Sequence, residues 1–170
     1  MLTIRNKREG VEIMISVHLP NGRQYEFHHV VFDYNGTLAE DGRVSDDVRQ
    51  LLAELAAKAH VAVITADTFG LARQELAAVP GVELIVLEPG QDGTEKARRV
   101  QEWGAEHTVV IGNGVNDQPM FFIAGLKICV LGPEGVSTGV LAAANIVVRS
   151  PADAIRLLLN PKRLIATLRT

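Results

Sequence analysis

Short apolar runs alternate with amphipathic stretches along this chain, and that alternation restricts the fold more than any other feature. The apolar runs, each of strand length, lie at residues 29–32, 61–65, 82–87, 109–111, 128–131 and 146–148. The amphipathic stretches lie at residues 46–60, 69–78, 93–104, 116–125, 136–143 and 151–159. Fully apolar strands separated by helices form a parallel sheet that is covered on both faces. The sequence therefore predicts an α/β fold of three layers, with a doubly wound, Rossmann-like parallel sheet.

A predicted hairpin precedes this core, and a short predicted helix follows it. Residues 13–19 alternate apolar and polar side chains, Asn21-Gly22 suits a tight turn with two positive φ angles, and residues 23–28 return as a strand. A chain of 170 residues holds one core rather than two. Residues 1–12 show no pattern. The predicted division of a single domain over 1–170 is a β-hairpin over 13–28, an α/β core over 29–159 and a C-terminal helix over 160–170.

Composition excludes several classes of partner and compartment. The net charge is −3 and no Lys/Arg cluster offsets it, which argues against nucleic acid as the main partner. Cys129 is the only cysteine, so no internal disulfide can form, as is usual in a reducing cytosol. The sequence shows neither a signal-peptide pattern nor the roughly 18 consecutive apolar residues of a membrane span. We therefore expect a cytoplasmic protein, with Cys129 as an inert core residue.

Ligands of parallel α/β sheets bind where strands end and helices follow, so these loops are the places to search for chemistry. The loop after the first core strand runs from Asp33 to Thr37, and its acid at the end of an apolar strand needs a charged or hydrogen-bonded partner. A capped turn with a surface acid explains this loop equally well. After the second strand, the Thr65 hydroxyl can hold a phosphate oxygen, although capping the next turn is the more common use. Asp67 is expected to cap the helix that follows.

Two further segments complete the set. Lys96 lies in the first turn of a helix, where most lysines are solvated but where this one can also reach the edge of the sheet. The loop from Gly112 to Asp117 contains two glycines, an acid and two amides, which suits a hydrated Mg²⁺ ion or a generic phosphate cradle. It lacks the spacing of the dinucleotide-binding fingerprint. His28 and His29 enter the first strand at its opposite end, so a structural role is expected for both.

In combination, the four segments resemble the motifs of the haloacid dehalogenase-like (HAD) phosphohydrolase superfamily. The matching stretches are VVFDYNGTLA, VAVITADT, Lys96 and VVIGNGVNDQPM, in this order, and the resemblance spans residues 30 to 150. The last stretch also resembles the GDGVND loop of P-type ATPase phosphorylation domains. The chain therefore looks like a member of the small, soluble, P-type-ATPase-like branch.

The resemblance implies a role for each matched residue. Asp33 would be the nucleophile that forms an aspartyl-phosphate. The residues that would bind the phosphate are Tyr34, Asn35 and Gly36 through backbone N–H groups, Thr65 with Ala66, and Lys96. The residues that would hold Mg²⁺ are Asp33, the backbone carbonyl of Asn35, Asn113, Asn116 and Asp117. The cation would be required because a carboxylate does not otherwise approach a phosphate dianion.

Two residues depart from the family pattern. Asn35 stands where the acid/base aspartate is usual, and such help is worth roughly 10²–10⁴ in rate, so a slow enzyme or a long-lived phospho-Asp33 is expected. Asn113 replaces a metal-binding aspartate, which predicts weaker Mg²⁺ binding. Both amides precede glycine, the sequence most open to deamidation. Conversion of both to aspartate is therefore a further hypothesis.

The resemblance also bears on the cap domain that many members of this family carry. Residues 38–64 hold only one helix, and residues 88–95 leave no room for an insertion, so no cap domain is present to select a small substrate. We expect an open site, whose phosphorylated substrate is presented by a macromolecule or covered by a neighbouring copy of the chain. The hairpin and the stripe of Leu164, Ile165 and Leu168 are candidate contact surfaces, although packing of the stripe on its own core is favoured.

Three functions remain open at this point. The first is a Mg²⁺-dependent phosphohydrolase or phosphotransferase acting through Asp33. The second is a catalytically degraded relative that serves as a phosphate- or metal-binding or regulatory module, favoured by Asn35 and Asn113. The third is a receiver-like switch, which fits the fold but would need an acidic cluster early in the chain, where none is found.

Overall fold

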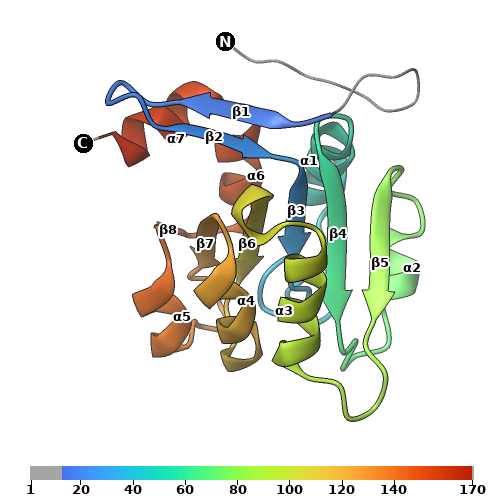
Figure 1. The fold of residues 1–170 in the computed structure, drawn as a ribbon. Coiled ribbons are helices and arrows are strands. Elements are labelled where there is room, and N and C mark those ends of the chain that lie inside the picture. Colours follow the sequence, from blue (N-terminus) through green and yellow to red (C-terminus); the bar gives the residue numbers. More distant parts are fainter. Residues whose placement is uncertain (1–12, 170) are drawn as a thin grey trace.

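Six strands form one parallel sheet at the centre of the computed structural model, which describes residues 13–169 (Figure 1). Their order in space is β5-β4-β3-β6-β7-β8. In chain order the strands are β3 (His29–Phe32), β4 (His60–Thr65), β5 (Val82–Val86), β6 (Thr108–Gly112), β7 (Leu126–Val130) and β8 (Ile146–Val148). Every apolar run predicted as a strand is present. The predicted doubly wound parallel sheet is therefore confirmed.

Helices cover both faces of this sheet (Figure 1). Alternate strand residues point to opposite faces, so Val30 and Phe32 pack under α1 and α6, while Val31 packs under α3, α4 and α5. Each helix presents an apolar stripe to its face of the sheet. The helices are α1 (Asp46–Ala56), α2 (Ala72–Leu76), α3 (Gly93–Glu102), α4 (Gln118–Ile123), α5 (Thr138–Ala143) and α6 (Pro151–Leu159), with short 3-10 helices η2 (Ala105–His107) and η3 (Val115–Asp117).

The chain changes direction between β3 and β6. It leaves β3 for β4 and β5 on one side, then returns to β6 on the other side of β3. Phe32 is in register with Ile111, and the Asp33 N–H donates to the Ile111 carbonyl at 2.9 Å. The carboxyl ends of β3 and β6 therefore lie side by side at the switch point, where sheets of this kind bind ligands.

The hairpin of β1 (Ile15–His18) and β2 (Gln24–Phe27) and the helix α7 (Pro161–Leu168) lie at the opposite, amino-terminal edge of the sheet (Figure 1). β1 packs against α7. Leu164 is fully buried, and Ile165 and Leu168 pack against the same core. The stripe of α7 therefore packs on its own core, as the sequence analysis favoured.

Two local predictions need correction. The hairpin turn is longer than a two-residue turn, since the Leu19 N–H donates to the Arg23 carbonyl and only Gly22 has a positive φ angle. The helix predicted at 69–78 begins at Ala72, because residues 66–71 form a loop that ends in the helix cap. The single-domain division stays a prediction, and its residues 1–12 lie outside the described part. Within residues 13–169, no helix is both long and apolar enough to span a membrane.

Candidate active site

Asp33 follows β3 directly, and its carboxylate forms an ion pair with Lys96. The Lys96 ammonium lies 2.6 Å from Asp33 Oδ1 and 2.8 Å from Asp117 Oδ1. Lys96 reaches this position from the first turn of α3, and its side chain is fully buried. Of its two possible environments, solvent or the edge of the sheet, the structure shows the second. A lysine buried between two carboxylates at the switch point is the centre of the candidate site.

Asp117 is held in place by backbone groups. Its Oδ2 accepts hydrogen bonds from the N–H groups of Asn113 and Gly114, each at 2.9 Å. Gly112 makes this close approach possible, because a Cβ atom there would lie 2.5 Å from Asp117 Oδ2. Gly112 therefore leaves room for the Asp117 carboxylate, and it is not needed here for a turn of the backbone.

Burial dominates the electrostatics of this cluster. It raises the pKa of Asp33 to about 6, an effect that Asp117 increases and Lys96 opposes. Burial would lower the pKa of Lys96, but the carboxylates of Asp117 and Asp33 outweigh it and hold this pKa above its usual value. Near neutral pH the site thus contains an ionised Asp33 beside a charged Lys96.

Thr37 links Asp33 to Asn113. Its hydroxyl donates to Asn113 Oδ1 at 3.0 Å and lies 3.5 Å from Asp33 Oδ2. The Asn113 amide also donates to the Gly135 carbonyl. Gly36 permits this contact, since its φ is +75° and a Cβ would lie 2.4 Å from Asn113 Nδ2. The sequence analysis named Thr37 only as part of the loop, because a sequence does not show which residue faces across two strands.

The predicted phosphate-binding groups are only partly available. The Gly36 N–H donates to the Ala39 carbonyl at 2.9 Å, so in this conformation it does not serve a phosphate. Thr65 Oγ1 accepts from the Asp67 N–H at 2.8 Å, the capping use that the sequence analysis favoured, although its hydroxyl hydrogen can still be donated. Asp67 Oδ1 in turn accepts from the Leu71 and Ala72 N–H groups, as expected of a helix cap. Ala66 is exposed.

The three asparagines named in the predicted metal site, with Asn35 contributing its backbone carbonyl, occupy different environments. Asn113 is buried in the cluster, whereas Asn116 is exposed and, within residues 13–169, no hydrogen bond or ion pair joins it to Asp33 or Asp117. The predicted role of Asn116 as a metal ligand therefore stays a prediction, with no contact to the carboxylates in support of it. Its backbone carbonyl instead lies against Gly93 at the start of α3. Asn35 is half-buried, and its Oδ1 has no hydrogen-bond partner among the described residues.

The hypothesis of deamidation is not supported by the backbone. The reaction requires attack by the amide nitrogen of the following glycine. The Gly36 N–H is bonded to the Ala39 carbonyl, and the Gly114 N–H is bonded to Asp117 Oδ2. Both nitrogens are thus engaged, which disfavours the reaction at either site.

The oxygen atoms of the cluster fit a divalent cation of the Mg²⁺ type. Asp33, Asn113 and Asp117 supply carboxylate and amide oxygens, and Asn35 Oδ1 is a buried acceptor without a partner among the described residues. Within residues 13–169 no group of three His, Cys, Asp or Glu side chains could hold a metal ion.

A hairpin turn after the Asp33 loop has anchors that the sequence did not reveal. Glu40 and Arg43 pair across Asp41-Gly42, both of which have positive φ angles. The buried Tyr34 hydroxyl donates to the Gly42 carbonyl at 2.8 Å, and burial raises the pKa of Tyr34 to about 12. We call residues 38–44 the flap. No local sequence pattern indicates these contacts, because their partners are distant in the chain.

Glu75 of α2 anchors the other end of the flap. It accepts from the Val44 N–H at 2.9 Å and forms an ion pair with Arg49. The Val44 N–H, followed by the Arg49 guanidinium, holds the pKa of Glu75 below its usual value. With these loops in place, Asp33 is only 6% exposed. These loops therefore cover most of Asp33 in this conformation, and the open site expected without a cap domain stays a prediction.

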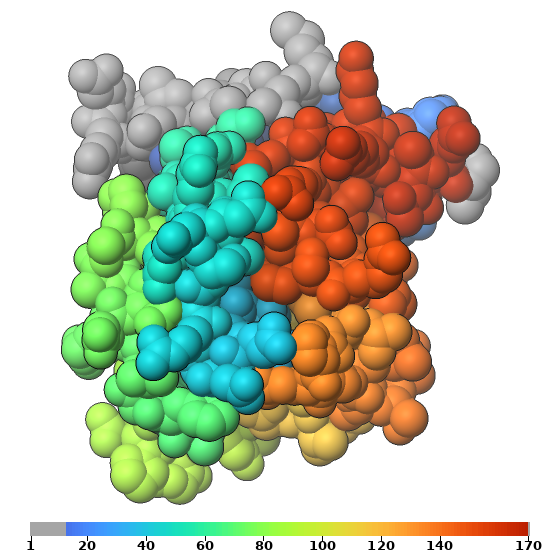
Figure 2. Space-filling view, turned by 180° about the vertical axis from the view of Figure 1, so that it is seen from behind, coloured from blue at the N-terminus to red at the C-terminus, as the bar shows by residue number. Residues whose placement is uncertain are grey.

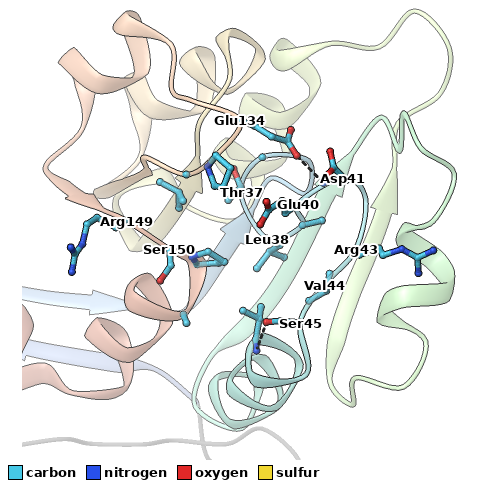
Figure 3. Close-up of a pocket in the computed structure, with 18 of the residues that line it drawn as sticks. Thr37, Leu38, Glu40, Asp41, Arg43, Val44, Ser45, Glu134, Arg149 and Ser150 are labelled. Atoms are coloured by element: carbon cyan, nitrogen blue, oxygen red, sulfur yellow. Dashed lines mark hydrogen bonds between the residues drawn. The ribbon is translucent and has the colours of Figure 1, made fainter.

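A pocket of about 780 Å³ lies beside the flap, on the face that carries α1 and α6 (Figures 2 and 3). Leu38 and Val44 lie at its centre, and Arg43 and Arg149 extend away from it on opposite sides (Figure 3). The Asp41 N–H donates to Glu134 Oε1 at 3.1 Å across its upper edge. The pocket touches the nucleophile loop through Gly36 and Thr37, but Asp33 is not among its lining residues.

The histidines proposed as structural lie at the far edge of the sheet. The His29 ring stacks on Trp103 with centroids 5.4 Å apart, and it meets the His60 ring edge-on. His28 meets His107 edge-on. Burial, followed by the neighbouring histidines, lowers the pKa of His29 to about 4. An aromatic cluster therefore lies at the amino-terminal edge of the sheet.

No family model matches the chain. An uncharacterized protein of Methanocaldococcus jannaschii is 46% identical over 61 residues, which are 36% of this chain and 66% of that protein. The match thus spans just under two thirds of that relative's length.

Solved structures match over most of the chain. The cobalt-bound deoxy-D-mannose-octulosonate 8-phosphate phosphatase from Haemophilus influenzae is 20% identical, with a TM-score of 0.62 over 83% of this chain and 86% of its own. The Moraxella catarrhalis 3-deoxy-D-manno-octulosonate 8-phosphate phosphatase, in complex with magnesium and phosphate ions and KDO, is 16% identical, with a TM-score of 0.61 over 82% and 90%. A haloacid dehalogenase-like hydrolase from Bacteroides thetaiotaomicron is 12% identical, with a TM-score of 0.58 over 76% and 98%. At these identities the similarity establishes the fold alone: the chain has the HAD fold.

Proposed function

We propose that this chain, built on the HAD fold, is a phosphohydrolase or phosphotransferase of the HAD type that acts through an aspartyl-phosphate on Asp33. The observation that carries the proposal is the buried Asp33 carboxylate at the end of β3, with the Lys96 ammonium 2.6 Å away and shared with Asp117. A carboxylate in this position can attack phosphorus, and the ammonium offsets the negative charge that gathers as it does so.

Other groups of the site have roles in the same reaction. The Thr65 hydroxyl retains a hydrogen that it can donate to a phosphoryl oxygen. Mg²⁺ would be held by Asp33, Asn113 and Asp117, and would neutralise charge between carboxylate and phosphate. Because Asp33 is 6% exposed, a substrate reaches it only when the loops at this edge move apart. The substrate is a phosphorylated molecule, presented by a macromolecule or enclosed by a second copy of the chain.

The names of two matched structures support this chemistry, since both are phosphatases, one bound to cobalt and the other to magnesium and phosphate. The sequence GNGVNDQP supports the narrower assignment to a soluble, P-type-ATPase-like branch. A cytoplasmic location, suggested by the single cysteine, belongs to the same proposal.

The decisive measurement is the intact mass of the protein after incubation with Mg²⁺ and acetyl phosphate. We expect a phosphate adduct on the wild type and none on Asp33→Asn, which keeps the size of the side chain but removes its charge. Replacement of the exposed Asp46 by Asn is the matched control and should retain the adduct. An adduct that persists on Asp33→Asn would contradict the proposal.

The second candidate is a binding or regulatory module on a degraded site. The engagement of the Gly36 N–H and the amides at Asn35 and Asn113 favour it. This candidate predicts Mg²⁺ or phosphate binding by calorimetry, without an adduct and without phosphate release from phosphate esters. Binding that disappears in Asp117→Ala would place it at the same cluster.

A further inference from the structure

The pocket of about 780 Å³ beside the flap lies outside the groups proposed for phosphoryl transfer. Asp33, Lys96 and Asp117 are not among its lining residues. Its volume falls within the range of roughly 300–1,000 Å³ that is usual for small-molecule sites. The pocket is therefore large enough for a small molecule other than the phosphorylated substrate.

The walls of this pocket come from separate parts of the chain. The flap contributes Leu38 and Val44 to one wall, and the other wall includes Ala152 at the start of α6 and Glu134 in the loop after β7. The Asp41 N–H joins the two walls by its hydrogen bond to Glu134 Oε1 at 3.1 Å (Figure 3). Because the flap forms one wall, the pocket exists only while the flap lies in this position, and a ligand bound there favours that position.

The floor of the pocket is apolar. Leu38 and Val44 of the flap line it together with Val48 in the first turn of α1 and Val130 at the end of β7. All four are almost fully buried, so each presents only a small apolar face to the pocket. A ligand with an aliphatic or aromatic body of modest size gains free energy by covering these faces.

Three carboxylates gather in the upper part of the pocket, those of Glu40, Asp41 and Glu134 (Figure 3). Within residues 13–169, the carboxylates of Glu40 and Asp41 have no hydrogen bond or ion pair, and that of Glu134 accepts only from the Asp41 N–H. All three side chains belong to exposed residues at the rim. The rim thus presents negative charge to whatever enters.

The cations that line the pocket do not balance this charge. Arg43 and Arg149 extend away from it on opposite sides, and Arg43 lies 3.9 Å from Glu75 instead (Figure 3). Arg156 forms an ion pair at 2.9 Å with Asp47, the fourth acid of the lining. Among the described residues, the carboxylates above the apolar floor are therefore left without a counter-ion.

We propose that this pocket binds a small organic cation, with an ammonium group on an aliphatic or aromatic body, and that the bound cation holds the flap closed. The ammonium lies among the carboxylates of Glu40, Asp41 and Glu134, and the body covers the apolar floor. Charge complementarity selects this ligand over a neutral or anionic molecule of the same shape.

The pocket is connected to Asp33 through the nucleophile loop. Gly36 and Thr37 line the pocket, and the Thr37 hydroxyl lies 3.5 Å from Asp33 Oδ2. The ligand therefore lies behind the loop that carries Asp33. Because a substrate reaches Asp33 only when the loops at this edge move apart, a ligand that stabilises the closed flap slows phosphoryl transfer.

A matched series of probes tests the charge preference. Phenylbutylammonium, phenylbutanol and phenylbutyrate share one apolar body and carry a cationic, a neutral and an anionic head group. In calorimetry at low ionic strength we expect a Kd of about 1 mM or tighter for the cation, weaker binding of the alcohol and no binding of the carboxylate. Added salt should weaken binding of the cation and leave that of the alcohol unchanged.

Neutral variants at the rim test the position of the ammonium. The double variant Glu40→Gln with Glu134→Gln removes two charges, and its side chain at the second position still offers an oxygen to the Asp41 N–H. It should bind phenylbutylammonium roughly 5-fold more weakly or less tightly still. Glu54→Gln, on the exposed side of α1, is the matched control and should bind it as the wild type does. Thermal unfolding without the probe verifies that both variants fold.

Hydrogen exchange measures the effect on the flap. At a concentration of phenylbutylammonium about 10 times its Kd, exchange of the Val44 N–H should slow about 10-fold, whereas exchange in β6 should not change. Formation of the Asp33 adduct from acetyl phosphate should slow as well, and only this last measurement rests on the proposed function.

The outcomes separate the inference from the function. Phenylbutyrate that binds as tightly as the cation, or no binding of any probe, would overturn the assigned ligand. Binding that the double variant leaves unchanged would place the cation elsewhere, and a bound cation that leaves flap exchange unchanged would disprove its effect on the flap. An absence of adduct even without the probe would count against the proposed function alone, because calorimetry and hydrogen exchange decide the inference independently.

Discussion

Lys96 is the residue on which the candidate site most depends. A fully buried ammonium is unfavourable unless it is paired, and here the two carboxylates that compensate it come from β3 and from the loop after β6. The same carboxylates would repel each other without it, because Asp117 raises the pKa of Asp33. We call Asp33, Lys96 and Asp117 the charged triad. Each member of the triad is therefore stable only in the presence of the others.

Replacement of Lys96 by Met should remove phosphoryl transfer and destabilise the fold. Two buried carboxylates would lose their counter-ion, which typically costs about 3–5 kcal/mol. Urea unfolding would measure this loss. The double variant with Asp33→Asn should recover part of it, because one of the two repelling charges is then gone. Lys162→Met on the exposed side of α7 is the control and should change stability little; equal losses in both would contradict the role assigned to the triad.

A second prediction concerns Gly112, at the end of β6. A methyl group there would lie 2.5 Å from Asp117 Oδ2, so Gly112→Ala should displace that carboxylate, abolish the adduct and cost about 1–3 kcal/mol. Gly132→Ala is the comparison, since its Cβ would meet the nearest atom, Val130 Cγ1, at an ordinary 3.7 Å. Mass spectrometry and thermal unfolding of the pair would check this. A fully active Gly112→Ala would disprove the packing argument.

Sequence reasoning located the residues of the site better than their contacts. Asp33 was identified because an acid at the end of an apolar strand needs a partner, and Lys96 because the first turn of its helix can reach the sheet edge and matches the family motifs. The structure brings the two side chains together. The predicted place of Asn116 in the site is not supported by a contact, because position in a loop does not determine the direction of a side chain. Glu75 gave no signal, since a glutamate in a helix is ordinary until its partners, Val44 and Arg49, are known.

Among the structural elements, the flap has the most consequence for access to Asp33. It is short, and contacts outside its own sequence hold it: the Tyr34 hydroxyl, Glu75 and the Glu134 carboxylate. The flap also buries Leu38, Ala39 and Val44 in the core, so opening it breaks apolar contacts as well as these hydrogen bonds.

Glu75→Ala should loosen this element selectively. The change removes the acceptor of the Val44 N–H and leaves Arg49 without its buried partner, at a cost of about 2–3 kcal/mol. Hydrogen exchange at Val44 and its neighbours should become faster, whereas exchange in β6 should not. Glu54→Ala, on the exposed side of α1, serves as the control. Unchanged exchange in the flap would refute the anchoring role.

At the level of elements, the sequence predicted well whether a segment is a helix or a strand, and less well where each segment begins and ends. Apolar runs identify strands because a parallel sheet is buried on both faces, and each predicted core strand is present. The start of α2 was missed because Asp67 caps the helix from beyond an intervening loop. The hairpin turn was misread because Asn-Gly also suits a longer turn in which only the glycine has a positive φ angle.

Across the whole molecule, the sheet separates two chemically different edges, with the charged triad at one and the histidine cluster at the other. His29 faces His60, Trp103, His28 and His107, and His60 is itself paired with Glu83. In the unfolded chain His29 takes up a proton near pH 6.5, but in the folded chain only near pH 4. The folded state thus binds fewer protons between these values.

It follows that His29 destabilises the fold as the pH falls. The neutral ring imposes no penalty above about pH 6.5, and the penalty grows down to about pH 4, to at most about 3 kcal/mol. Urea unfolding at a series of pH values should show this decline, and His29→Phe, which can still stack on Trp103, should reduce it. His18→Phe on the exposed face of β1 should not. A decline that is identical in all three proteins would rule out His29 as its source.

The contact between β1 and α7 has a practical consequence. Both elements lie at the amino-terminal edge of the sheet, whereas Asp33 and Lys96 lie at the carboxyl edge (Figure 1). A linker attached beyond α7 would therefore anchor the molecule to a sensor chip or a bead with its reactive edge turned towards the solution. Protein immobilised in this orientation could be exposed in turn to a series of phosphoryl donors, with bulky carriers meeting no obstruction from the support.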